Sequence, residues 1–571
     1  MLWLIAIAVG AAGAALQYGW SGPRRILAAP VPAALRAAAL ALVVGLLAGA
    51  PARPGRVPAP WVALDASQSM TLAGDTAGWR AALASARAAG GDTLFLFGDS
   101  LRPAPAAPRA GDTQTDITPA VERAAATGRP VVIVTDGALP APGPLRGLPA
   151  GSRVVVVPRA PARDVALAAL DAPRALVAGD TVEVRLTIAA GDAGSAAGAA
   201  AVFLDGRRLG GASFDSLAPY VRRDLTVRVP LAAREGPAAL EAVVSAPGDA
   251  EPRNDTLAVG VDVSRQPGAV FVSTSPDYDA RYALAVLRGA LDLPTRAFYH
   301  LSPGNWRQDG GYARVAESEV RAAFRDAPVA ILHGDTAAFG PPRQATRAPL
   351  ALIVPSAGDG NEWYAAGAPV SPLAGALEGL PWDSLPPVLA GPGPEPTGEW
   401  RGLVARRGRE ALTRTLVAGD ESPRRVVIVA ASDLWRWEFR GGASADAYTT
   451  LWGSIFDYLA ARRADRRAAV PDARLVRAGD PVVWRRGAAA DSAVTVRLAR
   501  RGSARVDTLH LHFPEGSALA RTGPLAAGVY DAAVRGGSAL LVVNASDELV
   551  PRAPTVRSEA VGGAPARGAA P

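Results

Sequence analysis

WVALDASQSM, residues 61–70, is an apolar run that ends in one carboxylate and two hydroxyls, those of Asp65, Ser67 and Ser69. A continuous apolar run of this length is typical of a strand in a parallel sheet that is covered on both faces. Oxygen-bearing side chains at every second position after such a strand form a cup suited to a hard divalent cation. The stretch therefore predicts an α/β fold with a cation site at the end of its first strand.

Two later segments extend this pattern. VVIVTDG, residues 131–137, is a second apolar run that ends in a carboxylate, Asp136. Thr115 stands just before a helix that we expect over residues 117–126, with Pro119 in its first turn. With residues 61–70, these segments resemble the metal-ion-dependent adhesion site (MIDAS) of von Willebrand factor A (VWA) domains.

The resemblance implies a set of ligands and a use for the ion. Mg²⁺ or Mn²⁺ would be held directly or through water, and one coordination position would stay open for an acidic group of a protein partner. The ligands that the resemblance implies are Asp65, Ser67, Ser69, Thr115 and Asp136. In the alternative interpretation, the aspartates only cap strand ends and the serines cap the next helix. Thr113 is the nearest rival to Thr115, which lies closer to the helix start.

Composition excludes several classes of function. The 571 residues are too many for one core, so we expect several domains. All 60 basic residues are arginine, which together with much Ala, Gly and Pro is typical of a high-GC bacterial genome. The net charge of +7 is spread along the chain, so nucleic acid is not an expected partner. The absence of cysteine excludes disulfides, thiolate metal sites and a cysteine nucleophile.

Two apolar stretches at the N-terminus predict a double transmembrane anchor over residues 1–52. Residues 1–20 are uncharged, and residues 31–51 carry only Arg36. Arg24 and Arg25 place the short loop between them in the cytoplasm, so the remainder of the chain would be extracytoplasmic, on the periplasmic side of the inner (plasma) membrane. The alternative is a signal peptide cleaved near Ala48–Ala50.

An anchor of this kind followed by a VWA-like region resembles the bacterial aerotolerance-type (Bat-like) membrane proteins. The resemblance covers about residues 1–160 and implies a MoxR-type AAA ATPase as a functional neighbour.

The rest of the chain predicts a multidomain α/β plus all-β fold. Strict alternation over Thr181–Ile188 predicts an immunoglobulin (Ig)-like β-sandwich. We expect these segments: a Rossmann-like VWA domain at 57–160, the Ig-like sandwich at 161–265, a second α/β domain at 267–465, a C-terminal β-sandwich at 470–548 and a disordered tail at 549–571.

The second α/β segment carries the competing function. We expect strands at 269–273, 297–301, 329–332, 350–354 and 426–430, and its Trp-rich ending resembles class I glutamine-amidotransferase-like domains. Such catalysis needs a cysteine on a sharp turn. Without one, we expect a non-catalytic domain. The alternative is a hydrolase or amidase that uses Ser356, with His300 or His333 near the same sheet edge.

These observations favour a membrane-anchored, extracytoplasmic binding or scaffold protein. Its VWA domain would use the metal ion to hold an acidic residue of another protein, and the other domains would be spacers and interaction surfaces.

Overall fold

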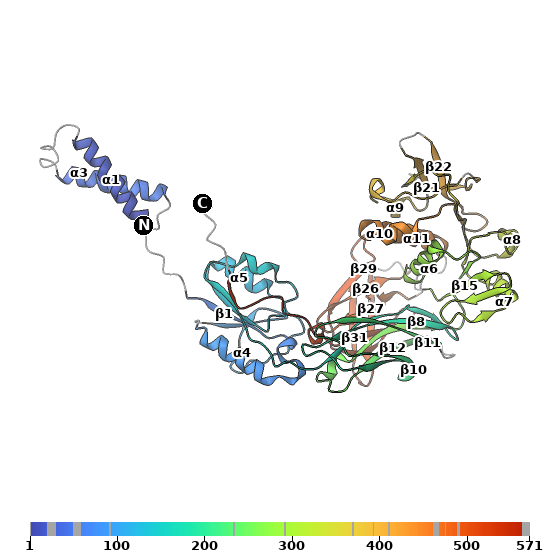
Figure 1. Ribbon diagram of the computed structural model, residues 1–571, viewed down its shortest axis with the longest axis horizontal. Helices are drawn as coiled ribbons and strands as arrows, with labels where there is room; N and C mark the ends of the chain where they lie inside the picture. The colour runs from blue at the N-terminus through green and yellow to red at the C-terminus, as the bar shows by residue number, and fades with distance from the viewer. Residues whose placement is uncertain are drawn as a thin grey trace.

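The structure is a computed structural model (Figure 1), and it describes most of the chain. The described residues are 2–19, 30–48, 59–90, 93–231, 235–290, 293–367, 370–391, 393–408, 412–460, 467–473, 475–487 and 492–561. The predicted cytoplasmic loop, with Arg24 and Arg25, lies outside them.

The N-terminal helices pack against one another in antiparallel fashion. They are α1 (Leu2–Gly19) and α3 (Pro30–Leu47). Close contact is possible because glycine stands where the helices touch: a Cβ on Gly10 would lie 2.4 Å from the Ala37 carbonyl oxygen. In the described part of the chain, α3 is long and apolar enough to cross a membrane, and the apolar stretch of α1 is shorter. One such helix near an N-terminus fits a membrane span or a signal sequence.

The stretch WVALD forms the centre of a six-stranded sheet with the order β3-β2-β1-β4-β5-β32. Its four central strands are parallel. Helix α4 packs on one face and α5 on the other, as expected for apolar runs buried on both sides. The bounds are β1 (Trp61–Asp65), η1 (Gln68–Gly74), α4 (Thr76–Ala88), β2 (Leu94–Phe97), β3 (Arg102–Pro103), α5 (Thr118–Thr127), β4 (Val131–Thr135), η2 (Gly143–Gly147), β5 (Ser152–Val156) and β32 (Glu559–Val561).

Two sheets that share one apolar core follow, and we call them the first sandwich. Their orders are β10-β9-β12-β13-β7 and β11-β8-β6. The alternation over residues 181–188 places Val182, Val184, Leu186 and Ile188 in that core, as predicted. The bounds are β6 (Val165–Asp171), β7 (Ala175–Val177), β8 (Thr181–Ala190), β9 (Gly198–Leu204), β10 (Arg207–Phe214), β11 (Arg222–Pro230), β12 (Gly236–Ser245), η3 (Pro252–Asn254) and β13 (Thr256–Ser264).

A ten-stranded sheet has the order β17-β16-β15-β14-β18-β19-β23-β22-β21-β20. Its five central strands are parallel and correspond to the five strands predicted from sequence. Helices α6 and α11 cover one face and α7 the other.

The elements of this part of the chain have the following bounds: β14 (Ala269–Ser273), α6 (Tyr278–Ala290), β15 (Thr295–Ser302), β16 (Asn305–Gln308), β17 (Arg314–Val315), α7 (Glu317–Arg325), β18 (Ala330–His333), α8 (Pro342–Ala345), β19 (Leu350–Ile353), β20 (Trp363–Gly367), α9 (Ala374–Leu377), η4 (Trp382–Ser384), β21 (Trp400–Arg407), β22 (Thr413–Asp420), β23 (Val426–Val429), α10 (Trp435–Arg440) and α11 (Ala443–Ala460).

The C-terminal part is β-rich and forms the second sandwich, with orders β24-β26-β29 and β25-β31-β30-β27-β28. The bounds are β24 (Ala469–Pro471), β25 (Val476–Arg477), β26 (Pro481–Arg486), β27 (Ala493–Arg500), β28 (Val506–His512), β29 (Leu519–Pro524), β30 (Gly528–Val534), β31 (Gly537–Asn544) and η6 (Asp547–Leu549).

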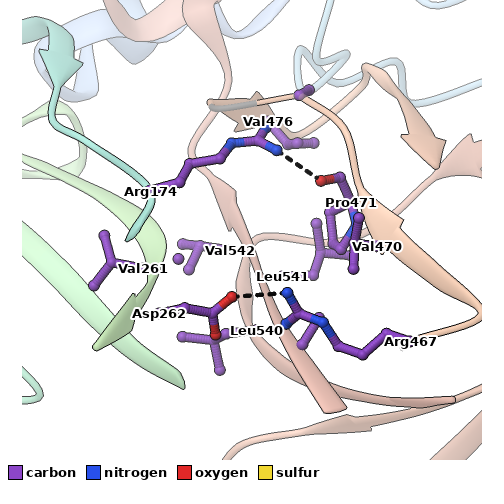
Figure 2. Close-up of a pocket in the computed structure, with 13 residues that line it drawn as sticks. Arg174, Val261, Asp262, Arg467, Val470, Pro471, Val476, Leu540, Leu541 and Val542 are labelled. Carbon is purple, nitrogen blue, oxygen red and sulfur yellow. Dashed lines mark hydrogen bonds and ion pairs between the residues drawn. The ribbon is translucent and has the colours of Figure 1, made fainter. Parts of the chain in front are cut away.

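The two sandwiches approach closely along β13 and β31. A Cβ on Gly260 would lie 2.6 Å from the Leu540 carbonyl oxygen, so glycine allows this approach. Figure 2 shows the polar rim of the joint, where Arg174 donates to the Pro471 carbonyl (3.1 Å) and Arg467 pairs with Asp262 (2.9 Å). Because these polar groups already bind one another, the small cavity between them is part of a domain interface.

The prediction of a disordered tail from residue 549 is wrong for residues 549–561. This stretch, which we call the return segment together with residues 546–548, runs from β31 back to the six-stranded sheet. There β32 pairs antiparallel with β5, and the Thr555 amide donates to the Gly137 carbonyl oxygen (2.7 Å). Figure 1 shows this red stretch among the blue elements of that sheet. The composition of this stretch suggested disorder. The open edge strand β5, however, offers backbone hydrogen-bond partners, and these order the stretch.

Candidate metal centre

Asp65 and Asp136 meet where the strand order of the six-stranded sheet reverses. Strands β1 and β4 are parallel neighbours, with Leu64 paired to Val134. The chain leaves β1 toward β2 on one side, whereas β4 adds on the other, so a crevice is expected at their carboxyl ends. Asp65 is the last residue of β1, and Asp136 follows β4 directly.

Asp65 is fully buried. Its Oδ1 accepts a hydrogen bond from the Ser67 amide (3.0 Å), and its Oδ2 accepts one from the Thr135 hydroxyl (2.8 Å). Burial and the nearby Asp136 carboxylate raise the pKa of Asp65 to about 7, although these hydrogen bonds favour the charged form. A cation in the crevice would relieve this electrostatic cost.

Ser67 and Ser69 place two hydroxyl oxygens side by side. Their Oγ atoms lie 2.8 Å apart, and both residues are buried. The loop that carries them passes into η1, where Ala73 has a positive φ of 54°. The Ala73 amide donates to the buried Glu251 carboxylate of the first sandwich (2.9 Å), so this neighbour fixes the loop.

Asp136 directs one oxygen toward no hydrogen-bond donor in the described structure. Its Oδ1 accepts from the Ala138 amide (3.0 Å). Its buried Oδ2 accepts no hydrogen bond, and the nearest cation is the Arg159 guanidinium, whose Nε lies 3.7 Å away. A buried carboxylate oxygen without a hydrogen bond is costly, and apart from its ion pair with Arg159 this atom is available to coordinate a cation.

Thr115 lies on the loop before α5, and its hydroxyl donates to Oε2 of Glu548 at 2.8 Å. Glu548 is buried on η6 in the return segment. The hydroxyl of the rival Thr113 donates to Asp99 (3.0 Å). The structure thus gathers Asp65, Ser67, Ser69 and Asp136 at one edge, whereas the Thr115 hydroxyl bonds to Glu548 and not to any of these four.

The residues fit a hard cation, provided that hydroxyls supply part of the shell. Within the described ranges, no three His, Cys, Asp or Glu side chains form a metal-binding group by themselves. Neighbouring ligands of octahedral Mg²⁺, each about 2.0–2.1 Å from the ion, lie about 2.9 Å apart. The Ser67–Ser69 and Thr115–Glu548 oxygen pairs are hydrogen-bonded at 2.8 Å, the usual length of such a bond, so a cation could bind them with little rearrangement.

Sequence reasoning missed three members of this site. Thr135 could have been predicted from the sequence, because it carries a hydroxyl group in an otherwise apolar strand. Arg159 and Glu548 gave no signal: Arg159 follows β5, and Glu548 is 433 residues from its partner Thr115.

The residues of the alternative catalytic site have separate partners. The Ser356 hydroxyl accepts from the Gly358 amide (3.2 Å), and the His300 ring packs at a tilt against Trp306. His333 contacts the fully buried Ser273 (Nδ1 to Oγ, 3.0 Å) and Asp277 (3.4 Å). In the described part of the chain, no hydrogen bond joins Ser356 to a histidine.

Asp65 gives the metal-free protein a specific pH dependence. A carboxyl group whose pKa is raised in the folded state holds a proton that the unfolded chain has lost. Stability should therefore fall as pH rises from about 4 to about 7, and Mg²⁺ should restore more of it at pH 8 than at pH 5.5. Hydrogen exchange of the β1 and β4 amides, with EDTA for the metal-free protein and with Mg²⁺ for comparison, measures this change in stability.

Asp65→Asn is the control, because asparagine cannot ionise. Burial also raises the pKa of Asp164 to about 8 and of Asp255 to about 7 in the first sandwich, so only the difference between wild type and variant belongs to Asp65. We compare the ratio of the wild-type exchange rate to the Asp65→Asn exchange rate at the two pH values. A ratio that is lower at pH 8 than at pH 5.5 contradicts the prediction.

No family model and no curated protein matches the chain. Similar solved structures cover parts of it. The CARDB domain of a Pyrococcus furiosus protein is 17% identical over 18% of this chain and 96% of its own, with a TM-score of 0.17. A β-glucosidase from Listeria innocua is 14% identical over 19% of this chain and 16% of its own (TM-score 0.14). A Paenibacillus cycloisomaltooligosaccharide glucanotransferase is 12% identical over 37% of this chain and 30% of its own (TM-score 0.17).

Proposed function

We propose that this protein is a membrane-anchored binding protein whose six-stranded α/β domain is VWA-like and holds Mg²⁺ or Mn²⁺ at a MIDAS-type site. The ion would bind an acidic group of a protein partner. The observation that carries the proposal is the meeting of two buried aspartates at the switch point of the sheet, where Asp136 Oδ2 lacks a donor. Two hydroxyls 2.8 Å apart stand beside Asp65.

The chemistry of these donors favours Mg²⁺ or Mn²⁺. Carboxylate and hydroxyl oxygens are hard ligands, and no cysteine is present to favour a softer ion. Two buried carboxylates repel one another, and a divalent cation neutralises both. When bound, the ion would supply a Lewis-acidic position for a further carboxylate.

The remaining parts of the chain fit a scaffold. The α1–α3 hairpin would anchor it, with the sheets on the extracytoplasmic side, although the two-span topology rests on the sequence. The first sandwich would be an Ig-like spacer, and the ten-stranded sheet a non-catalytic domain resembling class I glutamine amidotransferases. A MoxR-type ATPase as neighbour rests on family resemblance alone.

Mg²⁺ titration of the full-length protein in detergent, followed by calorimetry, tests the site. We expect one saturable site in wild type, and loss of at least 100-fold in affinity in Asp65→Asn and in the double variant Ser67→Ala/Ser69→Ala. The first removes a carboxylate charge, and the second removes two hydroxyl oxygens.

Asp116→Asn is the matched control. Asp116 lies on the same edge but is exposed, and its Oδ1 only accepts from the Thr118 amide. The Mg²⁺ affinity of Asp116→Asn should stay within twofold of the wild-type value. Absence of saturable uptake in wild type, or equal affinity in Asp65→Asn, would refute the metal centre.

A further inference from the structure

The return segment brings one acidic side chain to the candidate metal centre from within the same chain. Residues 546–549 connect the second sandwich to the six-stranded sheet, and η6 packs against η1, the turn that follows Ser67. On η6, Glu548 is 4% exposed, whereas its neighbour Asp547 has a half-exposed side chain. The burial of a carboxylate at this edge calls for a specific partner.

The contacts of Glu548 divide between its two oxygens. Oε2 accepts from the Thr115 hydroxyl (2.8 Å), and Oε1 faces Arg552 (3.3 Å). Burial is the largest cause of the raised pKa of Glu548, and repulsion from the Asp136 carboxylate adds to it. Arg552 also pairs with Asp547, whose second partner is Arg477 (3.4 Å), so two arginines face the two carboxylates of η6.

Backbone contacts hold the segment in this position independently of Glu548. The Ser546 hydroxyl donates to the Thr113 carbonyl oxygen (2.5 Å), on the loop that carries Thr115. The Asn254 side chain of the first sandwich donates to the Leu549 carbonyl oxygen (2.8 Å). Glu548 is thus fixed between two anchor points, with its carboxylate at a distance from Thr115 Oγ1 that suits adjacent positions on an octahedral ion.

We propose that Glu548 is the acidic ligand of the metal ion in the resting protein, so that the ion joins the return segment to the six-stranded sheet. This inference rests on the proposed metal centre. It identifies the first occupant of the open coordination position as the chain itself. A partner's carboxylate would then bind only by displacing Glu548, which makes the site self-occluded until a stronger or more concentrated acidic group arrives.

The first test uses the wild-type protein and Mg²⁺ alone. Saturating Mg²⁺, compared with EDTA, should slow hydrogen exchange of the amides at 546–556 at least tenfold, because the ion would fasten Glu548. Asp65→Asn should show no such slowing. This measurement leaves residue 548 intact, so it does not depend on the folding of a variant there.

The second test replaces the carboxylate. Glu548→Gln keeps an acceptor for Thr115 but removes the charge, and we expect a 10- to 100-fold loss of Mg²⁺ affinity by calorimetry and no Mg²⁺-dependent slowing at 546–556. Asp547→Asn, one residue earlier on η6, is the control, and its Mg²⁺ affinity should stay within twofold of the wild-type value.

The outcomes separate the two proposals. Mg²⁺ uptake that depends on Asp65, with unchanged affinity in Glu548→Gln and no slowing at 546–556, would overturn the role of Glu548 and leave the metal centre standing. No uptake in wild type would overturn both.

Discussion

Truncation after Ala545 is expected to destabilise the six-stranded sheet and its joint with the first sandwich by more than about 5 kcal/mol. Leu549 and Val550 are 2% and 3% exposed, and burial of each contributes about 1.5–3 kcal/mol. Val550 packs on Ala166 and Ala189 of the first sandwich. The loss of β32 adds to this cost, because its pairing with β5 disappears.

Hydrogen exchange of the β4 and β5 amides measures this destabilisation. A loss of about 5 kcal/mol is a large part of the free energy of unfolding of an ordinary domain. Truncation after Val561 is the matched control, since it removes none of the described contacts. Unchanged exchange in β4 and β5 after truncation at Ala545 would show that the return segment is not a structural part of the sheet.

Trp452→Ala is expected to destabilise the ten-stranded domain by about 3–5 kcal/mol, because a large side chain leaves a cavity in a closed core. Trp452 on α11 is fully buried, with ring centroids 5.5 Å from Phe456 and 6.3 Å from Tyr448. Exchange of β19 and β23 amides, or denaturant unfolding, reports the change.

Two further substitutions sharpen this result. Trp452→Phe should cost far less, since the buried indole Nε1 has no hydrogen-bond partner to lose. Phe439 has a side chain that is 75% exposed, so Phe439→Ala should change the free energy of unfolding by no more than about 0.5 kcal/mol. Equal losses for Trp452→Ala and Phe439→Ala would contradict the assignment of α11 to the core.

Local pattern predicted most of the buried elements. The apolar runs ending in Asp65 and Asp136 form neighbouring parallel strands, and Trp452 of the Trp-rich ending is buried on α11. The five parallel strands of the ten-stranded sheet were also predicted. Its antiparallel flanks were missed, because β20 and β21 carry polar and aromatic residues without a clean alternation.

The candidate site was predictable only in its local part. Asp65, Ser67 and Ser69 lie within five residues, and the strand before them fixes their direction. Thr115 remains a prediction as a ligand, since its observed hydrogen bond goes to Glu548. Thr135 was overlooked although it adjoins Asp136, and it holds Asp65 in place (2.8 Å).

The sequence by itself determined where the parallel strands lie and which oxygen-bearing side chains stand at their ends, because hydrophobic periodicity and strand direction are local properties of the chain. Only the tertiary structure decided that residues 546–561 return to the first sheet and bury Glu548 beside Thr115. No periodic signal encodes that contact: the return segment is positioned by backbone pairing at an open edge and by two anchors, Asn254 of the first sandwich and the Thr113 carbonyl.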